Sequence, residues 1–198
     1  MAMLHVERQR FTVDDYHRMA EVGILGPDDR VELIDGEIIR MSPIGSRHAA
    51  CVGRLTKMLT LRLAGAAQVF TQSPVQLDVR YEPQPDVLVL RPRDDFYAER
   101  LPTAADALFV MEVSDTSLAL DREKKLPAYG WSGVPEAWIV DLAGERIERH
   151  SEPFIGGFRL MTWARRGESL PSSVLPDLII EVDAVLGGPD LADKEPSS

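Results

Sequence analysis

The chain has 198 residues, of which 44% are hydrophobic, enough for one globular domain with a buried core. Its 32 acidic and 22 basic residues give a net charge of −10, which argues against a nonspecific nucleic-acid binder but leaves open an enzyme with an acidic site and a local basic patch. The single cysteine, Cys51, excludes an internal disulfide framework and a multi-cysteine zinc site. No apolar stretch approaches the roughly 18 residues of a membrane span, so we expect a cytoplasmic protein without membrane contact.

The N-terminal part predicts a helix followed by a hairpin. "FTVDDYHRMAEVG", residues 11–23, is typical of a short amphipathic helix capped by Thr12. "VELIDGEIIRM" predicts two antiparallel strands, because Asp35-Gly36 is the favoured pair for a two-residue type I′ turn. In that hairpin Glu32 faces Ile39, so it belongs either to a functional site or, with Glu37, to an outward polar face.

The middle of the chain changes from helical to strand periodicity. Residues 46–65 predict a helix from apolar residues at helical spacing, namely Val52, Leu55, Leu59 and Leu63. Strands are predicted within 69–79, where Val75, Leu77 and Val79 alternate, and at "DVLVL" and "LFVMEV". The polar segment between the last two predicts a loop with a short helix.

The last third predicts a helix from about residue 118, which Pro127 should kink or limit, and then further strands. The strands are expected in "EAWIVD", "GERIERH" and "FRLMTW", and "DLIIEVDAVLG" closes the fold. This order of elements predicts an α/β (α+β) domain with a mixed central β-sheet flanked by helices, over residues 1–188. The tail, residues 189–198, is expected to be disordered.

Two acids lie in otherwise apolar strands: Asp86 opens "DVLVL" and Glu112 lies inside "LFVMEVS". A buried, unpaired carboxylate costs several kcal/mol, and two close carboxylates repel each other. If the strands are antiparallel, both acids reach the same sheet edge, where a divalent cation would stabilise them. The alternative is structural: Asp86 caps a turn after Pro85, and Glu112 pairs with an arginine.

A possible cationic partner follows on the next helix. Asp121, Lys125 and Tyr129 are spaced by four and share one helix face, which could direct the lysine towards the two acids. The alternative is an ordinary Asp–Lys pair on a solvated surface. Tyr129, Trp131 and Trp138 are assigned to the core, because apolar residues flank them.

Together these motifs resemble the Uma-two family, restriction-endonuclease-like proteins of the PD-(D/E)XK nuclease superfamily. They occur in the family's order from about residue 11 to 187: "VELIDGEI", Arg47-His48, "QPDVLVL", "MEVSDTS", "DREKKLPAYGWSGVPEAWIVD" and "VLPDLIIEVDAVL". The resemblance implies a mixed sheet flanked by helices, with the acids at one edge.

The resemblance also implies roles for individual residues. Pro85-Asp86 matches the "PD" element and Glu112 the acid of "(D/E)XK", whose lysine position is taken here by Ser114. Lys125 resembles a migrated replacement that orients the attacking water or stabilises the phosphorane.

Asp86, Glu112 and the Val113 carbonyl would hold Mg²⁺ or Mn²⁺. Glu32 would bind a second metal or hold a metal-bound water, and His48 would contact phosphate or transfer a proton.

Three functions remain open. The first is a metal-dependent endonuclease acting on DNA, expected from the resemblance to be a homodimer. The second is a catalytically inactive nuclease-fold interaction module, favoured by the acidic charge and by Ser114. The third is a metal-dependent hydrolase of another phosphate ester.

Overall fold

The computed structural model describes residues 9–188, so the tail predicted to be disordered, 189–198, lies outside the described residues. Across residues 9–188 the central sheet has six strands in the order β3-β4-β5-β6-β7-β8. The strands are β3 Gln68–Thr71, β4 Val87–Leu90, β5 Ala107–Ser114, β6 Glu136–Asp141, β7 Arg146–Phe154 and β8 Gly157–Arg165. Strands β5 and β6 are parallel and the other neighbours antiparallel, so the mixed sheet predicted from the sequence is confirmed.

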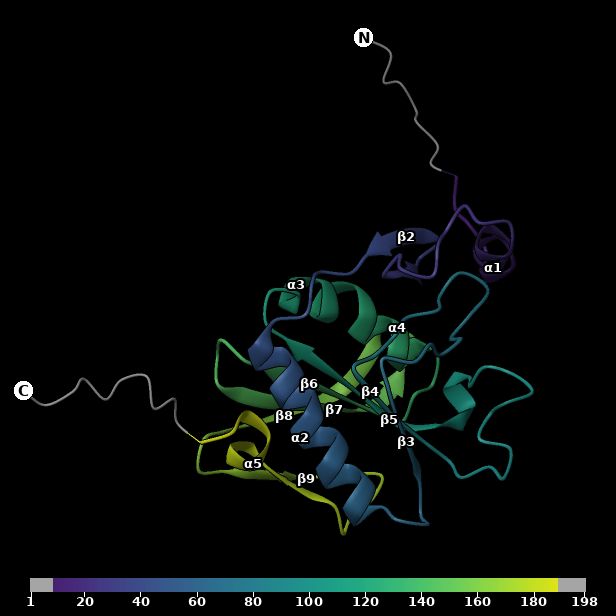
Figure 1. The fold of residues 1–198 in the computed structure, drawn as a ribbon. Coiled ribbons are helices and arrows are strands. Elements are labelled where there is room, and N and C mark those ends of the chain that lie inside the picture. Colours follow the sequence, from purple (N-terminus) through teal and green to yellow (C-terminus); the bar gives the residue numbers. More distant parts are fainter. Residues whose placement is uncertain (1–8, 189–198) are drawn as a thin grey trace, which may run out of the picture.

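Helices cover both faces of this sheet (Figure 1). On one face, α2 (Ser46–Arg62) packs Leu55 and Leu59 in a cluster with Met111 and Trp138, and α5 (Val182–Leu186) joins the same cluster. On the other face Tyr129 packs with Val110. Because both faces of β4 and β5 are covered, these strands are continuous apolar runs rather than alternating ones.

The connection from β5 to β6 carries the helical segment of the site. It consists of α3 (Leu118–Leu120), a π-helical turn η2 (Asp121–Lys125) and α4 (Leu126–Trp131). The Leu126 N–H donates to the Asp121 carbonyl, five residues back, immediately before Pro127. The helical path therefore widens and continues past the proline, which lacks the N–H of a regular turn.

The N-terminal elements form a separate layer at one end of the sheet, where Figure 1 shows α1 beside the hairpin. Helix α1 (Val13–Glu21) has the predicted Thr12 cap, completed by Asp15. Strands β1 (Val31–Ile34) and β2 (Glu37–Arg40) pair in the predicted register, with Glu32 opposite Ile39. Asp35 and Gly36 both have positive φ, as a type I′ turn requires. This layer has its own apolar cluster around Tyr16 and Leu33.

The predicted strand across residues 75–79 is wrong. Strand β3 ends at Thr71, and the chain then leaves the sheet at Gln72, whose φ is +48°. Pro74 follows, and the next N–H groups donate to scattered carbonyls, from Val75 to Pro83 and from Gln76 to Pro102. The alternation of apolar residues reflects loop packing, and the prolines prevent a continuous ladder.

The remaining segments close the fold. A 3₁₀ turn, η1 (Ala104–Asp106), lies in the loop before β5, as predicted. Strands β9 (Ser169–Pro171) and β10 (Ile179–Glu181) pair with each other and lead into α5. Within the described part of the chain, no helix is long and apolar enough to cross a membrane.

Candidate active site

Asp86 and Glu112 lie beside each other on neighbouring strands. Strands β4 and β5 are antiparallel, and their register pairs Val87 with Met111. Asp86 directly precedes Val87, and Glu112 directly follows Met111, so the two acids lie at the same edge of the sheet. This is the arrangement that the sequence predicted for antiparallel strands.

Asp86 replaces a missing strand partner for β5. Because β4 begins at Val87, no strand residue lies opposite Val113, and the Val113 N–H donates instead to Asp86 Oδ2 at 2.8 Å. The next carbonyl, of Ser114, accepts from Leu142 on the opposite side of β5. Since backbone groups alternate along a strand, the Val113 carbonyl points to the Asp86 side.

His48 reaches the same carboxylate from the first turn of α2. Its Nε2 lies 3.0 Å from Asp86 Oδ2, and both side chains are mostly buried. This hydrogen bond raises the pKa of His48, and burial opposes the shift only in part. His48 therefore fixes the orientation of Asp86.

Glu112 is only 4% exposed and shares one oxygen between two partners. The Tyr129 hydroxyl donates to Oε1 at 2.6 Å, and Lys125 Nζ lies 3.4 Å from the same atom. Burial raises the pKa of Glu112 well above its ordinary value, Lys125 opposes this shift, and nearby carboxylates reinforce it. Burial likewise raises the pKa of Tyr129, which keeps the phenol protonated as a donor.

Lys125 is 5% exposed and is surrounded by carboxylates. Its Nζ lies 2.9 Å from Glu32 Oε2 and 3.9 Å from Asp121 Oδ1, in addition to its contact with Glu112. Burial alone would lower the pKa of Lys125, but the surrounding acids outweigh it and raise that pKa above its ordinary value. The surrounding acids therefore favour the protonated form of Lys125, which is a hydrogen-bond donor.

Asp121 connects the lysine to the strand that carries Glu112. Its Oδ2 accepts from the hydroxyls of Ser114, at 2.7 Å, and Ser117, at 2.6 Å. Ser114 occupies the position two residues after Glu112, where the superfamily pattern has its lysine. Ser114 therefore orients Asp121, which lies beside Lys125.

Glu32 differs from Glu37 although both lie on one face of the hairpin. Glu32 is 1% exposed and also accepts from the Gln84 N–H at 3.1 Å, whereas Glu37 is partly exposed and pairs with Arg10 at 3.0 Å. The N-terminal layer thus contributes Glu32 to the cluster and keeps Glu37 on its surface.

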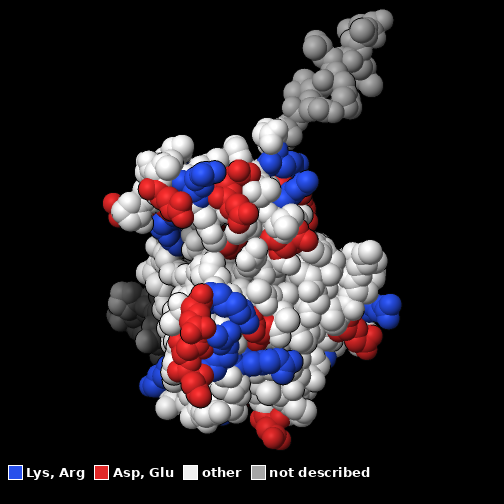
Figure 2. Space-filling view, turned by 90° about the vertical axis from the view of Figure 1, so that its right-hand side faces the viewer, with Lys and Arg blue, Asp and Glu red and all other residues white. Residues whose placement is uncertain are grey.

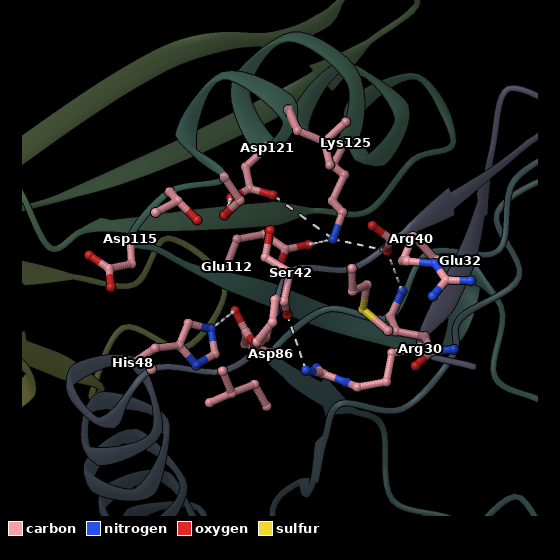
Figure 3. A pocket seen from close by; sticks show the side chains of 18 residues that line it. Arg30, Glu32, Arg40, Ser42, His48, Asp86, Glu112, Asp115, Asp121 and Lys125 are labelled. Atoms are coloured by element: carbon pink, nitrogen blue, oxygen red, sulfur yellow. Dashed lines mark hydrogen bonds and ion pairs between the residues drawn. The ribbon is translucent and has the colours of Figure 1, made fainter. Parts of the chain in front are cut away.

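A cavity of about 350 Å³ has Glu32, His48, Asp86, Glu112, Asp121 and Lys125 among its lining residues (Figure 3). Among the described residues, no three His, Cys, Asp or Glu side chains are arranged to ligate one ion. Asp86 Oδ1 and Glu112 Oε2, however, accept no hydrogen bond from any described residue. Two carboxylate oxygens with a neighbouring carbonyl are the donors that a hard divalent cation takes when water and phosphate complete its coordination. The residues present therefore fit such an ion.

Five of the six residues selected from the sequence line this cavity: Glu32, His48, Asp86, Glu112 and Lys125. The sixth, Val113, is not part of the lining, and its N–H donates to Asp86. Tyr129 was missed, because its apolar neighbours assigned it to the core, yet its spacing from Lys125 already placed it on the same helix face. Ser114 and Ser117 were missed as partners of Asp121, since a serine carries no distinctive spacing signal. Arg30 also lines the cavity and was not selected.

Comparisons with known proteins agree with this architecture. A family model described as "Uma2: Putative restriction endonuclease" matches residues 13–183. No curated protein is significantly similar to the chain in sequence. Among solved structures, the fold is similar to that of "a putative nuclease belonging to DUF820" from Anabaena variabilis ATCC 29413, with a TM-score of 0.72 and 14% sequence identity over 89% of this chain and 97% of that one. The likeness to that structure establishes a restriction-endonuclease-like fold. The family model matches most of the chain, and the protein therefore belongs to the Uma2 family.

Proposed function

We propose that this protein is a metal-dependent endonuclease that hydrolyses phosphodiester bonds of DNA. The observation that carries this proposal is the convergence of Asp86 and Glu112, from neighbouring strands, with the Lys125 ammonium on one cavity. Membership of a family described as restriction endonucleases supports it. Nucleases with this fold generally use divalent metal ions.

Asp86, Glu112 and the Val113 carbonyl would hold Mg²⁺ or Mn²⁺. Such an ion polarises a phosphodiester oxygen and lowers the pKa of bound water. His48 and the Val113 N–H hold one oxygen of Asp86, and Tyr129 holds one oxygen of Glu112. In each carboxylate the other oxygen is left for the ion.

Lys125 acts as a cation and not as a base. Its protonated ammonium donates hydrogen bonds that orient the attacking water and stabilise negative charge that develops on the phosphate. Glu32, 2.9 Å from Nζ, positions the ammonium. The general base is therefore a group other than Lys125.

The second candidate function is a catalytically inactive interaction module. The observation that favours it is the enclosure of Lys125 by three carboxylates, which neutralise a cation that catalysis would use. Under this function the cluster holds the N-terminal layer on the sheet, and no divalent ion binds.

Titration calorimetry with Mn²⁺ separates the two functions. We expect the wild type to bind Mn²⁺, and Asp86→Asn and Glu112→Gln to lose binding while they remain folded. Asp94→Asn is the matched control, because Asp94 is exposed on the loop that follows β4, at the far end of that strand from Asp86. Absence of Mn²⁺ binding by the wild type would remove the basis for the nuclease.

Plasmid nicking tests catalysis. We expect metal-dependent nicking by the wild type and its loss in Lys125→Ala, measured after circular dichroism has shown that this variant is folded. Persistent nicking would exclude Lys125 from the mechanism. Cutting both strands of a duplex uses two active sites, so we propose a homodimer, and the mass from sedimentation equilibrium tests it.

A further inference from the structure

The acidic lining of the cavity repels a polyanionic substrate such as DNA. Five acids line it, namely Glu32, Asp86, Glu112, Asp115 and Asp121, in a protein whose net charge is −10. On the face shown in Figure 2, basic side chains lie next to acidic ones. Attraction of a DNA strand therefore requires cations close to the cavity that no carboxylate already neutralises.

Arg30 meets this requirement on the hairpin side of the cavity. Its guanidinium donates through Nη1 to the Ser42 carbonyl at 3.1 Å, and no carboxylate of the described residues lies within ion-pair distance. Figure 3 shows Lys125 above the cavity and Arg30 below it, with Asp86 between Arg30 and His48. A guanidinium held by a single carbonyl keeps several N–H groups for a phosphate.

Arg47 meets the same requirement on the α2 side. It is exposed, and its Nη2 donates to the Leu142 carbonyl at 3.1 Å. Arg54, two turns further along α2, donates to the carbonyls of Val185 and Leu186, both at 2.7 Å. Neither arginine forms an ion pair with a described carboxylate; Glu145, which pairs with Arg166, is the carboxylate on which the charge of Arg47 acts.

Arg47 and Arg54 line a second cavity of about 370 Å³, which adjoins the first at the start of α2. Gly45 and His48 line the first cavity, whereas Ser46 and Arg47, between them in sequence, line the second. A strand that leaves the acidic cavity over the first turn of α2 therefore reaches these arginines next.

We propose that Arg30 and Arg47 bind backbone phosphates of the DNA on the two sides of the scissile bond, and that Arg54 binds the next phosphate on the α2 side. This proposal rests on the proposed nuclease function for the identity of its ligand. These three side chains attract the DNA backbone, whereas the acids of the cavity would hold the metal ion.

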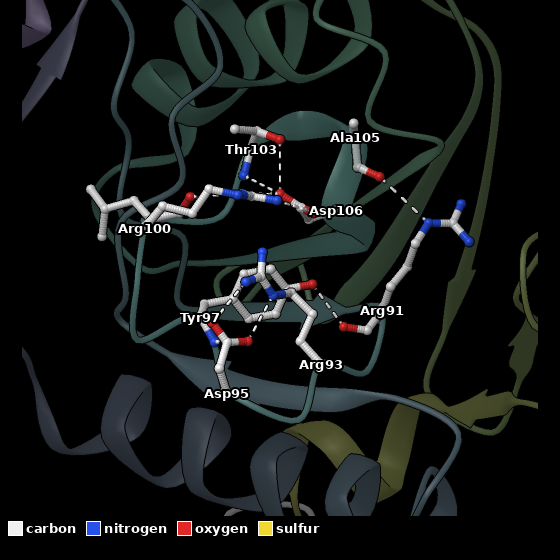
Figure 4. Close-up of polar contacts among 9 residues, drawn as sticks. Arg91, Arg93, Asp95, Tyr97, Arg100, Thr103, Ala105 and Asp106 are labelled. Carbon is white, nitrogen blue, oxygen red and sulfur yellow. Dashed lines mark hydrogen bonds and ion pairs between the residues drawn. The ribbon is translucent and has the colours of Figure 1, made fainter.

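The loop at residues 91–106 offers a matched control. Arg93 and Arg100 each pair with an aspartate, Asp95 and Asp106, beside the ring of Tyr97 (Figure 4). The side chain of Arg91, in contrast, is exposed and donates among the described residues to the Ala105 carbonyl alone, through Nε at 3.4 Å. Its bonding therefore resembles that of Arg30 and Arg47, but it follows the end of β4, whereas Asp86 precedes the start of that strand.

Fluorescence anisotropy with a labelled DNA duplex tests the proposal, in Ca²⁺ so that binding is measured without depending on cleavage. We expect Arg30→Ala, Arg47→Ala and Arg54→Ala each to raise Kd roughly three- to tenfold and to reduce the slope of log affinity against log salt by about 1. Arg91→Ala should leave both unchanged. Arg54→Lys, which keeps the charge, should retain most of the affinity and controls for the lost contacts to α5.

The outcomes separate this proposal from the nuclease function. If the wild type nicks plasmid but the three variants bind duplex as tightly as Arg91→Ala, the phosphate contacts are refuted and the nuclease stands. If the three variants lose affinity in a protein that never nicks, the contacts stand and catalysis is refuted. A wild type that binds no duplex refutes both.

Discussion

Lys125 Nζ lies 2.9 Å from Glu32 Oε2, and this contact joins the crossover between β5 and β6 to the N-terminal hairpin. Both side chains are almost fully buried, so each charge depends on the other for stabilisation. Glu112 and Asp121 complete the set around the lysine. The same ammonium therefore holds the N-terminal layer on the sheet and lies next to the proposed metal ligand.

Lys125→Met should destabilise the fold by about 3–5 kcal/mol, because it leaves buried carboxylates without their cation. Urea unfolding in EDTA, followed by circular dichroism, measures the loss. The matched control is Lys124→Met, since Lys124 is the exposed neighbour and should change the free energy of unfolding very little. Equal stability of the two variants would show that the lysine does not hold the cluster together.

Glu112→Gln should have the opposite effect on stability. Burial disfavours the charged form of Glu112, as its raised pKa indicates, and the amide oxygen of glutamine can still accept from Tyr129. We therefore expect the variant to melt a few degrees higher than the wild type at neutral pH in EDTA, although it no longer binds Mn²⁺. A lower melting temperature would mean that the ion pair with Lys125 outweighs the cost of burial.

The strands that carry the acids could be predicted from the sequence, because their signals are local. Asp35-Gly36 determines the hairpin register through turn geometry, and the apolar runs around Asp86 and Glu112 identify central strands. The proximity of the two acids then follows from the antiparallel pairing alone. Lys125 followed from the i,i+4 spacing together with the family resemblance.

The contacts that arise only from packing could not be predicted. The apolar sequence neighbours of Tyr129 predict a core residue, and they do not indicate that its hydroxyl donates to Glu112. The π-turn before Pro127 depends on hydrogen bonds that shift by one residue, which composition does not encode. Arg30 was missed because a surface arginine has no periodicity, and its place at the cavity depends on how the hairpin docks.

Tyr129→Phe should reduce the rate of nicking by about tenfold or more while the KM for DNA stays constant, because the hydroxyl positions Glu112 and does not contact substrate. Steady-state kinetics at varied plasmid concentration measures both values. Tyr97→Phe is the control: its hydroxyl also donates to a single oxygen, the Arg91 carbonyl at 2.7 Å, but on the loop at 91–106. An unchanged rate in Tyr129→Phe would leave the tyrosine with a packing role only.

Glu148 gives a pH dependence that is separate from the proposed site. Burial alone would raise its pKa, but hydrogen bonds from His150 and Arg122 and the charges of Arg122 and Arg146 outweigh it and lower the pKa to about 2. A lowered carboxyl pKa contributes stability above the unfolded value, and this stability is lost as the pH falls towards the folded value. Glu148→Gln should therefore melt below the wild type at pH 7, and the gap should close between about pH 4.5 and pH 2. A gap that is constant over this range would contradict the ion pairing.

Ser114→Lys tests whether Lys125 substitutes for the lysine of the superfamily pattern. Ser114 and Glu112 lie on the same face of β5, and the Ser114 hydroxyl contacts Asp121, so a lysine there would reach the same carboxylates. Lys125→Ala alone should lower nicking by about 10²–10³ and would leave space beside Glu112 for the new side chain. We expect the double variant Ser114→Lys/Lys125→Ala to recover part of the lost activity, whereas Ser132→Lys in the same background should not, because Ser132 lies at the far end of α4, where its hydroxyl donates to the Tyr129 carbonyl and does not line the cavity. Recovery in both double variants would mean that any added positive charge is sufficient, and recovery in neither would mean that the ammonium must approach from the helix side.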